Sequence, residues 1–251
     1  MTNHSTSSTD SIVVLYKGGR LPTWQKLPPA ERQAIEQQHV ELMLATARQT
    51  NLMRLEGFRL LTPERDFVRF WAIEFPTLTG AEVWIEAEMA PPYGAYGYYE
   101  YMLARSWAVD QFKHLVTNPL PPVIPQAADP HQIPQLDVDA NTIVVLLFER
   151  WQPEAAMLTP QERGERELSM LRQSIAEEHG LHRLEAFRLI GMQAAWRRLW
   201  IAEFPTLAGA ESWIQAEVGL PHGIYADKTF YLARKWAPAY FASWVLYGEN
   251  K

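Results

Sequence analysis

The sequence predicts an α+β fold built from one unit that occurs twice along the chain. Two observations predict it: a long internal repeat, and the same order of strand-like and helix-like segments in both copies. The length of 251 residues agrees with two units, because domains most often have roughly 100 to 150 residues.

The internal repeat is clearest in a segment rich in Trp and Phe. Residues 71–88, WAIEFPTLTGAEVWIEAE, return at 200–217 as WIAEFPTLAGAESWIQAE. The offset of 129 residues holds without a gap for Arg54–Ala108 against Arg183–Ala237, and it becomes 131 in the Pro-rich segment that begins at Leu27. We therefore expect the first long helix, or the loop after it, to differ in length between the copies.

Each copy contains six predicted elements. Runs of β-branched or alternating apolar residues predict strands, and two such runs joined by a short Pro-containing turn predict a hairpin. Thr159, Pro160 and Glu162 form a capping box that predicts the first long helix of copy two. In copy one the elements are a strand at 12–16, a helix, strands at 54–61 and 67–75, a helix from Thr77 to about 88, and a strand at 98–107. This order is that of the ferredoxin-like βαββαβ unit.

The predicted organisation has four parts along the chain. A polar, disordered tail covers residues 1–11, and the first ferredoxin-like α+β repeat covers 12–117. A linker at 118–141 holds six of the 18 prolines and is expected to be extended. The second ferredoxin-like repeat covers 142–251.

The strand at 67–75 is apolar on both faces, which predicts how the repeats pack. Two helices cover one face of the sheet in this unit, so the other face requires a second sheet. We expect the face with Arg69 and Trp71 to meet the sheet of the other copy. The predicted fold is therefore two tandem ferredoxin-like βαββαβ units packed sheet to sheet as an intramolecular pseudo-dimeric α/β barrel.

The composition excludes several classes of function. A net charge of −6 without a run of Lys or Arg argues against nucleic-acid and membrane partners. The absence of cysteine excludes disulfides, thiol nucleophiles and thiolate metal sites. There is no secretion signal, no apolar stretch long enough to span a membrane, no His-x-x-x-His pair and no glycine-rich nucleotide loop. We therefore expect a cytoplasmic protein without a metal or cofactor.

The element order and the repeated aromatic pattern resemble the dimeric α/β-barrel superfamily, over both copies. This resemblance implies a cavity for a small organic molecule, often in proteins that work without a cofactor. It implies a small-molecule-binding protein, with a cofactor-independent enzyme of the monooxygenase, isomerase or cyclase type as the leading hypothesis. The substrate would be aromatic or enolisable, and anionic. The alternative is a non-catalytic ligand-binding or assembly protein, and in either case a monomer (a pseudo-dimer) or a homodimer.

The predicted hairpin register brings arginines together beside the Trp residues. It places Arg59 opposite Arg69 and Gly57 opposite Trp71, with the same pairing in copy two. Adjacent like charges are unfavourable unless an anion lies between them, although both arginines could also point to water. The candidate ligand-binding residues are Arg59, Arg69, Trp71, Tyr96, Arg105, Arg188, Arg198, Trp200, Tyr225 and Arg234.

The turn before the last strand is where the copies differ most in chemistry. Tyr93 in copy one is replaced by His222 in copy two, and Asp227 follows five residues later. An imidazole can exchange protons near neutral pH, so His222 is the candidate general acid or base, with Asp227 as its carboxylate partner. The alternative is an ordinary histidine in a surface loop.

Overall fold

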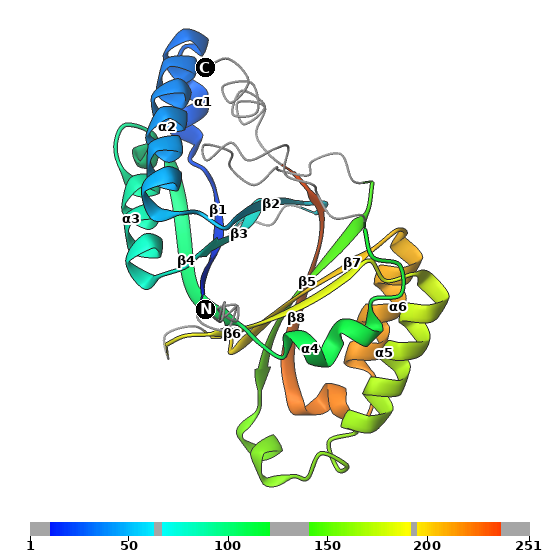
Figure 1. Cartoon of the computed structure of the whole chain (residues 1–251). Helices are drawn as coiled ribbons and strands as arrows, with labels where there is room; N and C mark the ends of the chain where they lie inside the picture. Colours follow the sequence, from blue (N-terminus) through cyan, green and yellow to red (C-terminus); the bar gives the residue numbers. More distant parts are fainter. Residues whose placement is uncertain (1–10, 63–66, 121–140, 192–194, 237–251) are drawn as a thin grey trace, which may run out of the picture. The chain divides into compact units, whose positions relative to one another are not determined.

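The computed structural model describes residues 11–62, 67–120, 141–191 and 195–236 (Figure 1). The chain forms two compact units. Of the described residues, the first unit holds 11–105 together with Lys235 and Trp236, and the second holds the remainder. Residues 1–10 of the predicted tail and 121–140 of the predicted linker lie outside the described residues, whereas Ser11, predicted as part of the disordered tail, is buried and donates to the carboxylate of Glu74.

The first unit contains a four-stranded antiparallel sheet in the order β4-β1-β3-β2. The helices α2 and α3 pack beside each other along this sheet (Figure 1). The elements are β1 (Ile12–Arg20), α1 (Pro22–Lys26), α2 (Pro29–Thr50), β2 (Arg54–Leu60), β3 (Arg69–Phe75), α3 (Leu78–Met89), η1 (Tyr93–Tyr96) and β4 (Gly97–Ser106).

The second unit repeats this arrangement, with strand order β8-β5-β7-β6. It also includes α4 (Val109–Phe112) and η2 (Lys113–Leu115), which follow the last strand of copy one. Its other elements are β5 (Ile143–Trp151), η3 (Pro153–Met157), α5 (Glu165–His179), β6 (Arg183–Leu189), β7 (Arg198–Phe204), α6 (Leu207–Val218), η4 (His222–Tyr225) and β8 (Ala226–Lys235). The predicted βαββαβ order is confirmed in both copies.

The predicted hairpin register is also confirmed. Arg59 pairs with Arg69 and Gly57 with Trp71, and the second copy has the equivalent pairs. The helix after each hairpin begins at a threonine cap: the hydroxyl of Thr77 accepts from the backbone N–H of Gly80 at 3.1 Å. Such a cap satisfies one of the free N–H groups of the first turn.

The first long helix of copy two starts later than predicted. The capping box forms, since the Glu162 carboxylate accepts from the backbone N–H of Thr159 at 2.7 Å. The chain then takes a left-handed turn at Gly164 (φ 68°), and α5 begins only at Glu165. A side chain at Gly164 would meet the ring of Pro221 at 2.8 Å, so glycine is required there for space as well as for conformation.

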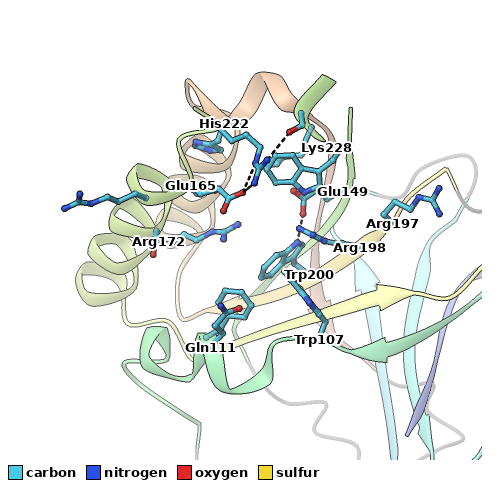
Figure 2. A pocket seen from close by; sticks show the side chains of 18 of the residues that line it. Trp107, Gln111, Glu149, Glu165, Arg172, Arg197, Arg198, Trp200, His222 and Lys228 are labelled. Carbon is cyan, nitrogen blue, oxygen red and sulfur yellow. Dashed lines mark hydrogen bonds and ion pairs between the residues drawn. The ribbon is translucent and has the colours of Figure 1, made fainter. Parts of the chain in front are cut away.

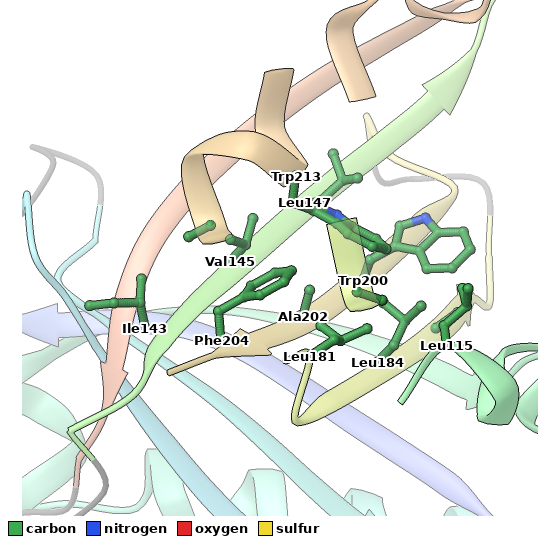
Figure 3. Packing of buried hydrophobic residues seen from close by; sticks show 13 residues of the cluster. Leu115, Ile143, Val145, Leu147, Leu181, Leu184, Trp200, Ala202, Phe204 and Trp213 are labelled. Atoms are coloured by element: carbon green, nitrogen blue, oxygen red, sulfur yellow. The ribbon is translucent and has the colours of Figure 1, made fainter. Parts of the chain in front are cut away.

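The prediction for the Trp-bearing face of the sheets was wrong. In the second unit Trp200 and Phe204 pack with Ala176 of α5 and Trp213 of α6 (Figure 3). Trp71 packs against α2 and α3 in the same way. These residues therefore lie on the face that the helices cover. Both faces of β3 and β7 are buried, so alternation along the strand could not distinguish the helix-covered face from the other.

Gly57 is expected to be required beside Trp71 although copy two has Ala186 at the equivalent place. A methyl group on Gly57 would lie 2.7 Å from Cζ3 of Trp71 and would overlap the carbonyl oxygen of Trp236. Gly57→Ala should therefore lower the free energy of unfolding by about 1 to 3 kcal/mol, as overpacking does. Urea unfolding measures this loss. The control, Ala186→Gly, should cost no more than about 1 kcal/mol; a Gly57→Ala protein as stable as the parent would contradict the expectation.

Candidate functional site

The second unit contains a cavity of about 970 Å³. It lies between α5 and the helix-facing side of β5, β7 and β8, and the segment around α4 forms a further wall (Figure 2). The cavity is thus on the face of the sheet that carries Trp200 and Arg198, as the sequence predicted. That face meets helices, however, and not the second sheet that was expected. Its volume is in the range of pockets that hold small organic ligands.

Aromatic rings line one side of the cavity. The rings of Trp107 and Trp200 lie 5.7 Å apart, and Phe112 lies 5.0 Å from Trp200, both edge to face. The backbone N–H of Trp107 donates to the carbonyl of Ala186 at 2.8 Å, which fixes the segment before α4 against β6. These rings, with Trp151, offer flat apolar surfaces to a planar ligand.

The lining carries more positive than negative charge. Six cationic side chains face it, against two carboxylates, Glu149 and Glu165; the cations are Arg163, Arg166, Arg172, Arg197, Arg198 and Lys228. The Arg198 guanidinium lies over the ring of Trp107 at 4.3 Å and forms no ion pair with any described carboxylate. An unpaired guanidinium on an aromatic wall is suited to bind an anionic group.

A buried carboxylate network holds two of these cations in place. Glu217 of α6 is fully buried and accepts from Arg172 of α5 at 2.6 Å and from Lys228 of β8 at 2.7 Å. Burial alone would raise the pKa of Glu217, but the two adjacent cations outweigh it and hold the pKa below its ordinary value. The network links α5, α6 and β8 beside the cavity.

Glu149 is the second buried carboxylate, and it faces the cavity directly. It is 5% exposed, and its Oε2 accepts from Nε1 of Trp200 at 2.9 Å. In the sheet it lies opposite Arg198 on one side and opposite Lys228 on the other. A row of three charged residues therefore crosses the cavity wall.

His222 lies at the edge of the same cavity and is only 3% exposed, so the alternative of a surface-loop histidine does not hold. Neither ring nitrogen has a partner with hydrogen-bond geometry among the described residues. Burial, followed by the positive charge of Lys228, lowers the pKa of His222, although the nearby Ala216 carbonyl and Glu217 oppose this. His222 is therefore mainly neutral near pH 7.

Asp227 does not accompany His222 as predicted. Its carboxylate accepts from Arg150 at 2.6 Å and from Gln152 at 3.2 Å, on the exposed side of the strands. These hydrogen bonds, Arg150 foremost, lower the pKa of Asp227. Spacing in sequence suggested proximity, but β8 begins between the two residues and directs them apart.

Most other predicted ligand residues lie away from the cavity. Arg59 and Arg188 are exposed, which agrees with the alternative that these arginines point to water. Arg234 donates to the backbone carbonyl of Asn141 at 2.9 Å. Tyr96 packs on Trp24 at 5.5 Å in the first unit. Tyr225 and Arg105 are half-buried and do not line the cavity. Of the ten predicted ligand residues, Arg198 and Trp200 line it.

At the corresponding place in the first unit there is a small cavity of about 20 Å³, lined by Arg69 and Trp71 among others. Aromatic side chains occupy the corresponding space. Tyr16 and Tyr101 lie 5.0 Å apart, and Tyr93 stacks on the imidazole of His39 at 3.6 Å. The two units therefore share a framework and differ in what fills it.

The sequence analysis missed Glu149, Arg172 and Lys228, although the repeat contained a signal for them. The register shows that Glu149 holds the place of Gly18 and Lys228 the place of Tyr99. A position-by-position comparison of the copies would have revealed new charges at positions that face the helices.

Among the described residues, no three His, Asp or Glu side chains are grouped as a metal site, and no helix is long and apolar enough to cross a bilayer.

Glu217→Gln should destabilise the protein by about 3 to 5 kcal/mol, because Arg172 and Lys228 would remain buried without their carboxylate. Since the folded-state pKa of Glu217 is lowered, its contribution is complete above the ordinary pKa of 4.5 and is lost as the pH falls below that value. Urea unfolding at pH 7 and at pH 4 measures both effects. Glu88→Gln is the control, since Glu88 pairs with the single imidazole of His39 at 3.3 Å; equal losses for the two variants would contradict the expectation.

Comparison with solved structures shows the fold of the whole chain. No protein-family model matches the sequence, and no curated protein matches it. A variant of chlorite dismutase from Candidatus Nitrospira defluvii is similar in structure, with a TM-score of 0.68, 10% identity and 96% of each chain covered. The same enzyme in complex with imidazole has a TM-score of 0.66 and 10% identity, with 96% of each chain covered. A putative chlorite dismutase gives 0.61 at 11% identity, over 91% of this chain and 96% of the other. The chain has the dimeric α/β-barrel fold, as a tandem pair of ferredoxin-like repeats.

Proposed function

We propose that the second unit binds a planar, anionic organic molecule in the cavity beside α5. The observation that carries this proposal is the guanidinium of Arg198, which lies on Trp107 and has no carboxylate partner among the described residues. The aromatic walls supply contact area and orientation, and the excess of cations supplies the preference for an anion. The first unit, with its filled cavity, is structural in this proposal.

The leading chemistry for this site is proton transfer or oxygenation on an aromatic or enolisable substrate, without a cofactor. Neutral His222 can accept a proton from a bound substrate, and its lowered pKa keeps it in the accepting form near pH 7. The nearby positive charges of Lys228 and Arg172 would stabilise an enolate or phenolate. The other function class is a non-catalytic binding protein that uses the same cavity.

Haem is a second candidate ligand, because the structurally similar chlorite dismutases belong to a haem-binding group of this superfamily. The described residues fit haem. His222 lines the cavity, and neither of its ring nitrogens has a hydrogen-bond partner among these residues. Arg198 and Arg166 could pair with the two propionate groups of haem. His222 would then hold the iron, and the haem would supply redox chemistry.

A cytoplasmic, monomeric or homodimeric protein without nucleic-acid or membrane partners remains our prediction.

Arg198→Leu should weaken the binding of 2-naphthoate, a planar aromatic acid, by about 10- to 100-fold. A charge-assisted hydrogen bond contributes about 1.5 to 3 kcal/mol. The melting temperature should stay unchanged or rise, since Arg198 faces Arg188 across the hairpin. Isothermal titration calorimetry measures the affinity. Arg188→Leu removes an exposed charge from the facing strand and should bind as the parent does; equal weakening in both variants would contradict the assignment of Arg198.

Haem is tested separately by adding hemin and recording the absorption spectrum. If haem is the ligand, binding to the parent protein should shift the Soret band of hemin with one-to-one stoichiometry, and His222→Ala should not produce this shift. The variant Tyr93→Ala alters the equivalent residue of the first unit and should leave the spectrum unchanged. A spectrum that does not depend on His222 would remove haem as the ligand of this cavity.

A further inference from the structure

Glu149 places an acceptor in a cavity that otherwise selects an anion. The residue is 5% exposed, so it is largely removed from bulk water, and it lines the cavity wall. An ionised carboxylate offers about four acceptor positions. From the part of the chain that the structure describes, it receives one side-chain hydrogen bond, from Trp200 at 2.9 Å.

Neither of the two cations beside Glu149 in the sheet forms an ion pair with it. Lys228 lies opposite it on β8, but its ammonium group donates to the carboxylate of Glu217 at 2.7 Å and to the backbone carbonyl of Glu217 at 2.8 Å. Arg198 lies opposite it on β7, but its guanidinium is over Trp107. Glu149 lines the cavity, and Trp200 is the one described side chain that donates to it.

The first unit shows that the fold does not require a carboxylate at this place. Gly18 stands there, and a side chain on Gly18 would lie 2.9 Å from the hydroxyl of Tyr16. Burying a carboxylate with one partner costs free energy, so its presence in the open cavity needs a compensating interaction. A ligand with only acidic groups would be repelled by Glu149 and would not supply one.

We infer that the ligand is an aromatic acid that also carries a hydrogen-bond donor, a hydroxyl or an amino group, and that Glu149 accepts from this donor. The inference rests on the proposed function, because it assigns the other end of the same ligand. The acidic group pairs with Arg198, and the ring lies against the Trp side chains. Glu149 thereby discriminates amino- or hydroxy-substituted aromatic acids from unsubstituted ones.

Three naphthoates and two variants, Glu149→Gln and Arg198→Leu, test this inference by isothermal titration calorimetry. The parent protein should bind 6-hydroxy-2-naphthoate about tenfold or more tightly than 6-methoxy-2-naphthoate, which has the same size but no donor. Glu149→Gln retains an oxygen for Trp200 and removes the negative charge. In this variant the hydroxy preference should fall to about threefold or less, and unsubstituted 2-naphthoate should bind more tightly than to the parent, because repulsion is relieved.

A merely structural role of Glu149 cannot explain a smaller preference for the hydroxy acid together with tighter binding of 2-naphthoate in the Glu149→Gln variant. If the hydroxy and methoxy acids bind the parent equally while 2-naphthoate still depends on Arg198, the inference is overturned and the proposed anion site stands. If no naphthoate binds, or none depends on Arg198, the proposed function fails together with the inference. A Glu149→Gln protein that keeps the full hydroxy preference would also overturn the assignment of Glu149.

Discussion

The candidate site depends on the ion pairs that the buried carboxylate of Glu217 forms with Arg172 and Lys228. Two cationic side chains, Arg172 and Lys228, enter a helix–sheet interface that in the other unit is largely apolar and aromatic. Buried cations are tolerated only when they are paired and hydrogen-bonded, and Glu217 provides both conditions. Burial, followed by the positive charge of Lys228, lowers the pKa of His222, and Arg172 adds to this while Glu217 opposes it. The network therefore contributes both to the polarity of the cavity and to the protonation state of its histidine.

The duplication provides an internal comparison for each of these residues. Both units retain the glutamate at the end of the second helix, Glu88 in one and Glu217 in the other. Its partners differ: a histidine in the first unit, an arginine and a lysine in the second. The strands, hairpin registers and threonine caps agree between the units, so the difference lies in the side chains that face the helices. The fold thus specifies where a cavity can form, and these side chains decide whether it is open.

The sequence predicted the fold well because its main signals are local or repeated. The register that pairs Gly57 with Trp71 followed from turn position and alternation alone. The site was predicted less well, because its residues meet only through packing: α5 brings Arg172 to Glu217 across 45 residues of chain. His222 was identified because it replaces Tyr93 in a matched turn. Asp227 was wrongly joined to it, since nearness along the chain says nothing about which side of a strand a residue faces.

The charged interface of the second unit is therefore better explained by function than by stability. Replacing buried ion pairs with packed apolar side chains is often neutral or stabilising, so a buried network is weak evidence of a stability requirement. The first unit demonstrates the apolar solution on the same framework: Tyr16 and Tyr101 fill the space, and Gly18 stands where the second unit has Glu149. The second unit instead keeps about 970 Å³ open, with Arg198 on the wall and no carboxylate paired to it among the described residues, and this contrast supports the proposal that the second unit binds a ligand.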